Sequence, residues 1–210
     1  PDIFVVVAFK ILPKVIINIP SFGSLNLHAS LLPRYRGAGP IQWALMNGEK
    51  TTGVTIFQIE PKVDTGDILM QKRVDIKEED NMFTLGMRLC KNGANMMIET
   101  LNNIEKGNQI KRLRQNTLLA TPAPKIQKEM TIINWGWEAK KIHNWVRGLT
   151  PYPGMSTNYN GKRLRIFKTS VITGTSINPG KIVEAKDDRL IVATGKDLIR
   201  IYEMQTDGKR

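Results

Sequence analysis

The chain of 210 residues is long enough for a catalytic domain with a small appended module, and hydrophobic residues make up an ordinary 41% of it. It contains no run of about 18 apolar residues, so the sequence predicts no membrane span and no membrane partner. The net charge is +12, and the one cysteine, Cys90, excludes an internal disulfide and indicates a reducing, cytoplasmic compartment.

The first half of the chain has the pattern of an α/β unit. A β-branched run over residues 3–8 predicts a strand buried on both faces of a parallel sheet. The further elements, in chain order, are a strand, a helix, two strands and a long helix, over residues 24–28, 39–48, 53–59, 68–76 and 81–105. Asp80 is the expected N-cap of the long helix, and Cys90 is expected to be a small buried side chain within it.

The second half of the chain has a different sequence pattern from the first. Residues 108–126 lack periodicity and contain Thr-Pro-Ala-Pro near their end, which is typical of a linker. An amphipathic helix follows, and then short β-prone runs that predict a small closed barrel, over residues 137–147, 164–169, 180–184, 190–193 and 198–202. The sequence therefore predicts a catalytic domain, a linker and a β-rich domain, over residues 1–107, 108–126 and 127–210.

Positive charge is concentrated in the second half. Residues 108–210 carry 19 Lys and Arg against 8 Asp and Glu, whereas residues 1–107 carry 12 against 11. Clustered cations favour a polyanionic partner, because phosphates release counterions when such cations bind them. A well-solvated basic surface would have the same composition, so the charge alone leaves both interpretations open.

Two short motifs carry groups suited to chemistry. In Asn26-Leu27-His28 the amide and the imidazole would lie side by side near a strand end, because residues i and i+2 of a strand share a face. A structural histidine is the commoner interpretation of such a pair in isolation. In the loop around Asp64-Thr65-Gly66 the carboxylate belongs either to a turn or to a site.

Together these motifs resemble the folate-dependent formyltransferases. The matching stretches are Asn-Leu-His-Ala-Ser-Leu-Leu-Pro-Arg-Tyr-Arg-Gly at residues 26–37, Pro-Ile-Gln at 40–42 and Asp-Thr-Gly-Asp at 64–67. Within that group, His-Ala-Ser followed by Pro-Ile-Gln is similar to the methionyl-tRNA formyltransferase family. The similarity continues through Gln115 and residues 121–126, 133–135 and 147–154, so it covers essentially the whole chain.

The resemblance implies an α/β fold, in which a partial Rossmann-like formyltransferase domain is followed by a small OB-like β-barrel. The chain is expected to be a fragment cut at both ends, with the family's N-terminal half-sheet missing and the barrel incomplete. The implied reaction transfers the formyl group of 10-formyltetrahydrofolate, a co-substrate, to the α-amine of methionyl-initiator tRNA in translation initiation. A cytoplasmic monomer without a metal is expected, and the fragment alone is not expected to retain full activity.

The resemblance also assigns roles to residues. Asn26 would donate to the developing oxyanion, a contribution of about 3–4 kcal/mol when water is excluded. His28 would be a second donor or the proton carrier, and Asp64 would orient it and help to take the amine proton. The implied folate-binding residues are Phe9, Ser30, Leu31, Leu32 and Pro33, and the implied tRNA-binding residues are Arg36, Lys162, Arg163, Arg165 and Lys168.

One departure from the family pattern and three alternatives stay open. Residues 8–13 are one residue shorter than the family's usual segment, which bears on the folate wall that they would build. The alternatives are an enzyme acting on glycinamide ribonucleotide or a sugar nucleotide, a hydrolase that releases formate from the same donor, and an RNA-binding module with an inactive catalytic half. The basic second half argues against the first two, and the intact Asn26, His28 and Asp64 argue against the third.

Overall fold

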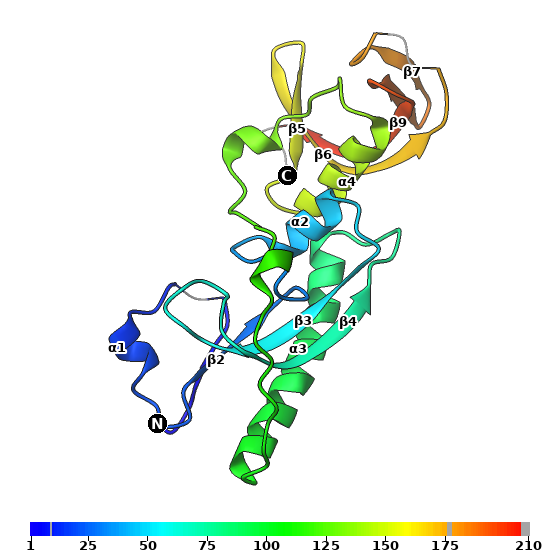
Figure 1. Cartoon of the computed structure of the whole chain (residues 1–210). Helices are drawn as coiled ribbons and strands as arrows, with labels where there is room; N and C mark the ends of the chain where they lie inside the picture. Colours follow the sequence, from blue (N-terminus) through cyan, green and yellow to red (C-terminus); the bar gives the residue numbers. More distant parts are fainter. Residues whose placement is uncertain (9, 176–177, 207–210) are drawn as a thin grey trace. The chain divides into compact units, whose positions relative to one another are not determined.

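The computed structural model describes residues 1–8, 10–175 and 178–206 (Figure 1). The chain forms two compact units, and each is treated by itself below. Unit 1 contains residues 1–43, 50–77 and 84–125, and unit 2 contains residues 44–49, 78–83 and those from 126 onward. No helix in the described ranges is long and apolar enough to cross a membrane.

Unit 1 is built on a four-stranded mixed sheet in the order β1-β2-β3-β4. The strands span Phe4–Val6, Ser24–His28, Thr51–Gln58 and Ile68–Asp75. β1 is parallel to β2, and the other pairs are antiparallel. The predicted strands are present, but the expectation that the first is buried on both faces is wrong: β1 is an edge strand, and Val5 is 43% exposed.

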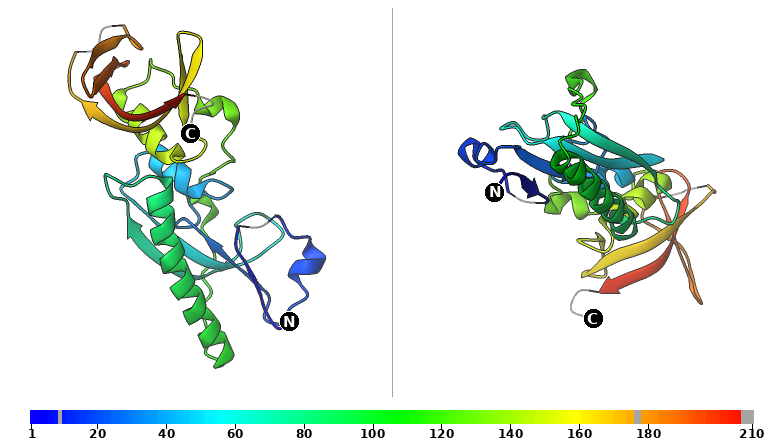
Figure 2. Two further views of the ribbon diagram at one scale, coloured as in Figure 1. Left: turned by 180° about the vertical axis from the view of Figure 1, so that it is seen from behind. Right: turned by 90° about the horizontal axis from the view of Figure 1, so that it is seen from below.

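A long helix, α3 (Met82–Glu105), lies across one face of this sheet (Figure 2). Its apolar side chains recur at helical spacing, and Leu85 and Leu89 are buried. Gly93 lies against the Leu27 side chain so closely that a Cβ there would overlap it. Because side chains alternate along a strand, Leu27 faces the helix and its neighbours Asn26 and His28 project from the opposite face.

Two details predicted for α3 are wrong. The residue whose side chain caps the helix is Asn81 rather than Asp80, since Asn81 Oδ1 accepts a hydrogen bond from Phe83 N at 2.9 Å. Cys90 is exposed, not buried. It follows the buried Leu89 by one position, about 100° around the helix, and therefore turns toward solvent.

The shorter elements of unit 1 surround the sheet. They are α1 (Lys14–Ile17), the start of α2 (Pro40–Met46) and the 3₁₀ turn η1 (Thr117–Leu119). Residues 113–124, in which the sequence showed no periodicity, run along the sheet of unit 1. Leu113 forms a bridge with Ile68, and Pro122 forms one with Arg36.

Unit 2 contains an antiparallel five-stranded sheet in the order β5-β6-β9-β8-β7. In chain order its elements are η2 (Lys128–Thr131), α4 (Ala139–Leu149), β5 (Met155–Tyr159), β6 (Lys162–Ile172), β7 (Ile182–Lys186), β8 (Arg189–Ala193) and β9 (Leu198–Thr206). α4 packs on β6 through an apolar stripe at helical spacing: Ile142, Val146 and Leu149. Within the described residues no ladder joins β5 to β7, so the predicted closed barrel is not confirmed.

β5 was missed by the sequence analysis, although a signal for it exists. Asn160-Gly161 connects β5 to β6, with Tyr159 paired to Lys162. Both turn residues have positive φ, of 48° and 75°, as a two-residue type I′ hairpin requires. An Asn-Gly pair between two polar strands predicts such a hairpin even where the strands lack strong hydrophobic alternation.

Candidate active site

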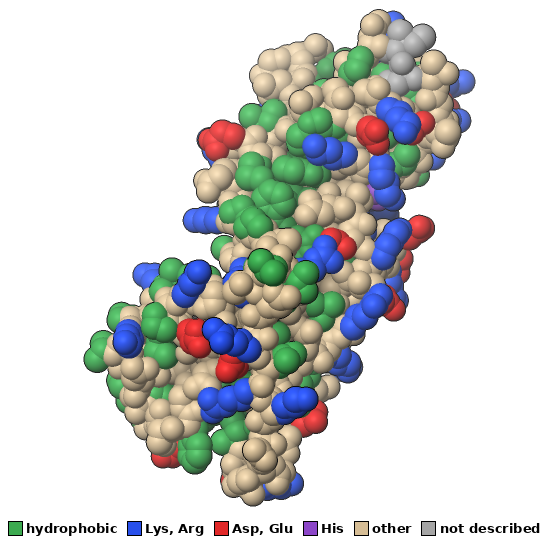
Figure 3. All heavy atoms as spheres, viewed as in Figure 1, with side chains coloured by type: hydrophobic (Ala, Val, Ile, Leu, Met, Phe, Trp, Pro, Cys, Tyr) green, Lys and Arg blue, Asp and Glu red, His purple; other side chains and the backbone are tan. Residues whose placement is uncertain are grey.

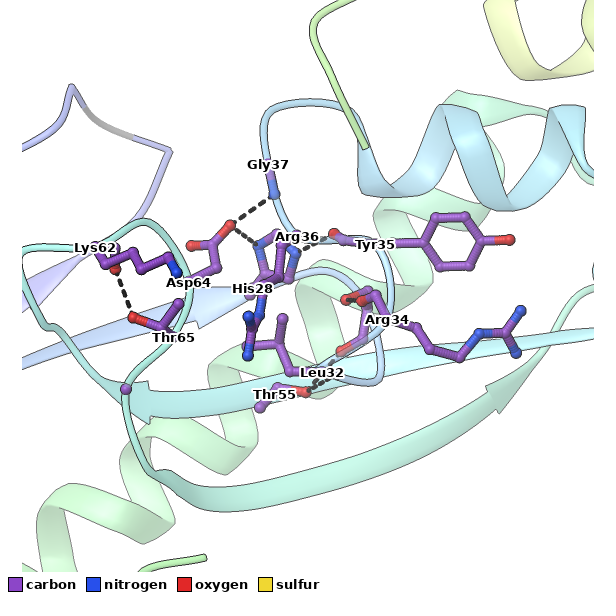
Figure 4. Close-up of polar contacts among 12 residues, drawn as sticks. His28, Leu32, Arg34, Tyr35, Arg36, Gly37, Thr55, Lys62, Asp64 and Thr65 are labelled. Atoms are coloured by element: carbon purple, nitrogen blue, oxygen red, sulfur yellow. Dashed lines mark hydrogen bonds and ion pairs between the residues drawn. The ribbon is translucent and has the colours of Figure 1, made fainter. Parts of the chain in front are cut away.

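Of the polar side chains predicted for catalysis, Asn26 and His28 project from the face of β2 away from α3, and Asp64 lies in the loop between β3 and β4. His28 Nδ1 is 3.7 Å from Asp64 Oδ2, and the two side chains are only 8% and 10% exposed (Figure 4). Gly37 N donates a hydrogen bond to the same carboxylate oxygen at 2.8 Å. The structure therefore brings His28 and Asp64 together, although 36 positions separate them in the sequence.

The contacts of the His28 ring fix the roles of its two nitrogens. Nε2 lies 2.7 Å from the backbone oxygen of Tyr35. A carbonyl oxygen only accepts, so Nε2 carries a proton and donates it. Nδ1 is then the nitrogen that gains or loses a proton, and it faces the carboxylate of Asp64. A proton on Nδ1, or a water between the two groups, makes this arrangement favourable.

Asn26 lies two residues before His28 and borders a pocket. The pocket has a volume of about 110 Å³, and its lining includes Asn26, Asp64 and the apolar residues Ile11, Leu12 and Val63. Among the residues that the structure describes, Asn26 Oδ1 is buried and finds no hydrogen-bond partner. A buried amide group without a partner is costly, and a small polar ligand in the pocket would satisfy it. With the amide turned by 180°, its NH₂ would occupy the same place.

Thr55 holds the start of the loop that follows β2. It is opposite His28 on β3 and fully buried. Its hydroxyl donates to the Ser30 backbone oxygen at 2.6 Å and accepts from Leu32 N at 3.2 Å and Gln71 Nε2 at 2.8 Å. These hydrogen bonds hold the backbone of the loop rigidly, and the loop therefore supports the His28 side chain at the strand end.

The next part of this loop is held by residues 121–123. Tyr35 N donates to Thr121 Oγ1, and Ala123 N donates to the Arg36 backbone oxygen at 2.6 Å. Gly37 has a φ of 120°, and a Cβ there would come within 2.6 Å of the Ala123 oxygen. Glycine is therefore required at the position whose amide binds Asp64.

Of the residues predicted to bind folate, none that the structure describes is among those that line the pocket. Phe9 lies outside the described residues. Ser30 is fully buried, and its hydroxyl donates to the Arg34 oxygen. Leu32 packs in a core cluster with Phe57 and Ile68. Leu31 lies against Gly53, and Pro33 follows a cis peptide bond. Their role in binding folate stays a prediction.

The pocket instead has apolar lining residues that the prediction of site residues omitted. Ile11 is 75% exposed and Val63 is 45% exposed, and both border the pocket beside Asn26. Exposed aliphatic side chains flanking a polar strand end are a recognisable sign of a ligand site. The signal in the sequence was the apolar pair Ile11-Leu12 before Pro13, in the segment that the resemblance linked to the folate wall.

The residues predicted to bind tRNA do not form one row. The Arg36 guanidinium donates to Gln115 Oε1. From Lys162 to Ile166 the side chains of β6 alternate, so Arg163 and Arg165 share a face that Lys162 does not. Lys168 lies beyond a register shift, with its Nζ 3.8 Å from Glu203.

One cation of this set takes part in a groove of unit 2. Arg163 and Lys128 line a pocket of about 360 Å³, together with Thr131, Ile132 and Thr157. Lys and Arg side chains are spread over the visible face of unit 2, with fewer Asp and Glu side chains among them (Figure 3). This is a distributed positive surface rather than a single cluster. In the part of the chain that the structure covers, no three His, Cys, Asp or Glu side chains gather as metal ligands would.

Comparison with known proteins places both halves of the chain in one family. The formyl transferase family matches residues 1–101, and the formyl transferase C-terminal domain matches residues 125–210. The methionyl-tRNA formyltransferase of Thermodesulfovibrio yellowstonii is 47% identical over 211 residues, which cover 100% of this chain and 67% of that protein. The one from Caldanaerobacter subterraneus is 44% identical, with coverages of 100% and 68%.

Solved structures share the fold. HypX from Aquifex aeolicus in complex with tetrahydrofolic acid matches with a TM-score of 0.77 and 22% identity, over 100% of this chain and 36% of that one. Methionyl-tRNA formyltransferase from Clostridium thermocellum matches with a TM-score of 0.67 and 23% identity, over 97% and 79%. On the sequence matches over its whole length, this chain belongs to the methionyl-tRNA formyltransferase family of formyl transferases.

Proposed function

We propose that this chain contains the catalytic residues that transfer the formyl group of 10-formyltetrahydrofolate to the α-amine of methionyl-initiator tRNA, in translation initiation. The observation that carries the proposal is the pocket beside Asn26 and Asp64, with His28 next to Asp64. Its volume of about 110 Å³ is enough for a formyl group and a few neighbouring atoms, since one water occupies about 30 Å³. The complex of HypX with tetrahydrofolic acid supports a folate donor.

Asn26 is suited to stabilise charge on the formyl oxygen. As the amine nitrogen bonds to the formyl carbon, negative charge collects on that oxygen, and a fixed NH₂ group beside it lowers the barrier. Asn26 is held on β2, opposite Phe57 of β3, and its buried Oδ1 position has no hydrogen-bond partner among the described residues. A donor held by a strand needs no reorganisation during the reaction.

His28 and Asp64 are suited to move the protons. The amine loses one proton when its nitrogen bonds to the formyl carbon, and the leaving nitrogen gains one when its bond to that carbon breaks. His28 Nδ1 exchanges a proton while Nε2 stays bonded to the Tyr35 oxygen, and Asp64 stabilises the charged imidazole. The pair ends the cycle in its starting state, so the reaction needs no further acid or base.

Unit 2 would contribute non-specific contacts to phosphates. Its exposed cations, such as Lys128 and Lys168, attract a polyanion without reading its sequence.

We further propose domain limits of 1–107 and 127–210, with a partial Rossmann-like fold for the first domain and an OB-like fold for the second. The matched ranges 1–101 and 125–210 support these limits. A monomer in the cytoplasm is consistent with one cysteine.

The decisive experiment offers the full-length protein one formyl donor with each of three acceptors, and with no acceptor as the control. Labelled formyl-folate is supplied with charged initiator tRNA, an amino-sugar nucleotide, glycinamide ribonucleotide or buffer alone. We expect the label on methionyl-tRNA, with little on the small acceptors and little free formate. Faster transfer to a small acceptor, or formate release that needs no acceptor, would exclude the tRNA assignment.

A further inference from the structure

Gln115 is a buried residue in an exposed segment. Residues 111–114 and 116–119 are exposed to solvent, whereas Gln115 is only 7% exposed. Burying a polar amide costs free energy unless its donors and its acceptor are satisfied. The bonding partners of this side chain therefore indicate its role.

Both ends of the Gln115 amide are bonded. Nε2 donates to the backbone oxygens of Asp64 at 3.0 Å and Gly66 at 2.8 Å. Oε1 accepts from Nε and a terminal nitrogen of Arg36, at 3.1 Å and 2.6 Å. One side chain thus ties the loop that carries Asp64 to the loop that follows β2.

The loop that carries Asp64 needs such a tie. Asp64 has a φ of 53°, in the left-handed region that residues other than glycine rarely adopt. Gly66 lies so close to the Gln58 backbone oxygen that a Cβ would overlap it. A strained loop keeps its conformation only where its surroundings determine it. The two hydrogen bonds that Gln115 Nε2 donates are accepted by Asp64 and Gly66, the residues on either side of Thr65, and so hold this strained part of the loop.

We propose that Gln115 is a positioning residue for formyl transfer. By holding the oxygens of Asp64 and Gly66, it keeps the Asp64 carboxylate against the Gly37 amide and the His28 ring. The inference rests on the proposed function, because Gln115 would act through Asp64 and would not itself contact a substrate. Gln115 is not itself among the residues that line the pocket, so its loss would act mainly by disturbing the orientation of the Asp64 carboxylate.

Two variants of the full-length protein test this proposal. Gln115→Met keeps the size of the side chain and removes both bonding ends. Gln115→Glu keeps an acceptor for Arg36 and loses the donor to the two loop oxygens. We expect kcat to fall about tenfold in both variants, with KM for both substrates changed less than about twofold, because orientation and not binding is affected.

Asn116→Ala is the matched control in the same segment. Asn116 Oδ1 accepts from Leu118 N at 3.0 Å and, within the described ranges, its side chain forms no hydrogen bond with the loop of Asp64. We expect this variant to keep the wild-type kcat. An equal loss of kcat in Asn116→Ala, a wild-type kcat in Gln115→Glu, or a loss that only follows the fraction of unfolded protein would each overturn the proposal.

A nuclear magnetic resonance measurement decides the positioning claim independently of turnover. In the unaltered protein the side-chain amide protons of Gln115 should exchange slowly with solvent, and the Gly37 amide proton should show the downfield shift of a bond to a carboxylate. In Gln115→Met the Gly37 proton should move upfield. Exchange at the rate of a free amide, or an unmoved Gly37 resonance, refutes the role of Gln115. If the unaltered protein transfers no formyl group, the proposed function fails. The resonance measurement still tests whether Gln115 holds the Asp64 loop, because it does not depend on turnover.

Discussion

The polar groups of unit 1 and those of unit 2 are organised in different ways. Around His28 hydrogen bonds link neighbouring polar groups: Gly37 N donates to Asp64, His28 Nε2 donates to the Tyr35 oxygen, and Gln115 donates to the Asp64 loop. These side chains are nearly buried. On unit 2 the cations of β6 lie on both faces or beyond a register shift, and their acidic neighbours are exposed.

The difference determines how each region should respond to mutation. In a connected, buried network, removal of one member leaves other groups unsatisfied, so a single change has a large effect. On an exposed charged surface each pair contributes little, and solvent and salt screen it. The first region should fail abruptly under single substitutions, and the second should weaken in small increments.

The largest effect is expected from removing a side chain of unit 1 that we propose to be catalytic. Asn26→Ala and His28→Ala in the full-length protein should each lower kcat by about 100-fold or more, because each group acts mainly in the transition state. Affinity for tRNA should change little. Steady-state kinetics and a binding titration measure the two quantities separately.

His143→Ala is the control for this prediction, since the chain has only two histidines. His143 lies on α4, with Nδ1 3.0 Å from Thr169 Oγ1, so its loss should affect stability and leave kcat unchanged. A His28→Ala enzyme with near wild-type kcat would contradict the view that unit 1 holds a connected catalytic network.

A smaller effect is expected from reversing charges on unit 2. Lys128→Glu combined with Arg163→Glu alters two cations of one groove, and should weaken tRNA binding about tenfold at moderate salt and lower the salt slope by about 2. Lys168→Glu, beside Glu203, should have a weaker effect. Binding titrations between about 50 and 200 mM salt test this. Equal effects would indicate that the positive surface acts as a whole, and unchanged binding would leave it as a solvated surface only.

Local patterns in the sequence were sufficient for much of the fold and for the first half of the site. Strand alternation placed Asn26 and His28 on one face, and helical spacing located α3 within one residue. These features depend on neighbours in the chain, which the sequence displays directly. The resemblance to a family, rather than any local pattern, linked Asp64 to His28, because a contact across 36 positions leaves no local trace.

The features that the sequence did not predict come from tertiary contacts. Gln115 lies in the segment predicted to be a linker, and its two bonds to the Asp64 loop bury it there. Val5 was expected inside the sheet, but β1 has one paired strand, which leaves it half exposed. The closed barrel was inferred from the number of short strands, and strand number does not determine whether the first and last strands pair.

The smallest effect concerns the pH dependence of unit 2 and tests whether its buried polar groups serve stability. Burial, and after it the charges of Arg147 and Lys140, lower the pKa of His143 from 6.5 to about 4, although the Thr169 bond and Glu78 act to raise it. The folded state therefore favours the neutral ring. Between about pH 6.5 and pH 4 the unfolded chain binds a proton that the folded chain does not, so stability falls as the pH is lowered through this window.

Because the ring is partly exposed, we expect the free energy of unfolding to fall by about 1–2 kcal/mol over this window rather than by the full value that the shift implies.

The measurement is urea unfolding of the full-length protein at several pH values, followed by tryptophan fluorescence. His143→Gln is the matched variant, since it retains a group that can bond to Thr169 and does not titrate. The difference in unfolding free energy between the two proteins isolates His143 from the carboxylates that titrate nearby. It should be flat above pH 6.5 and should shift in favour of the variant below it. A constant difference from pH 4 to pH 7 would show that His143 does not couple protonation to folding. The contrast between the two units would then rest on His28 and the charge reversals alone.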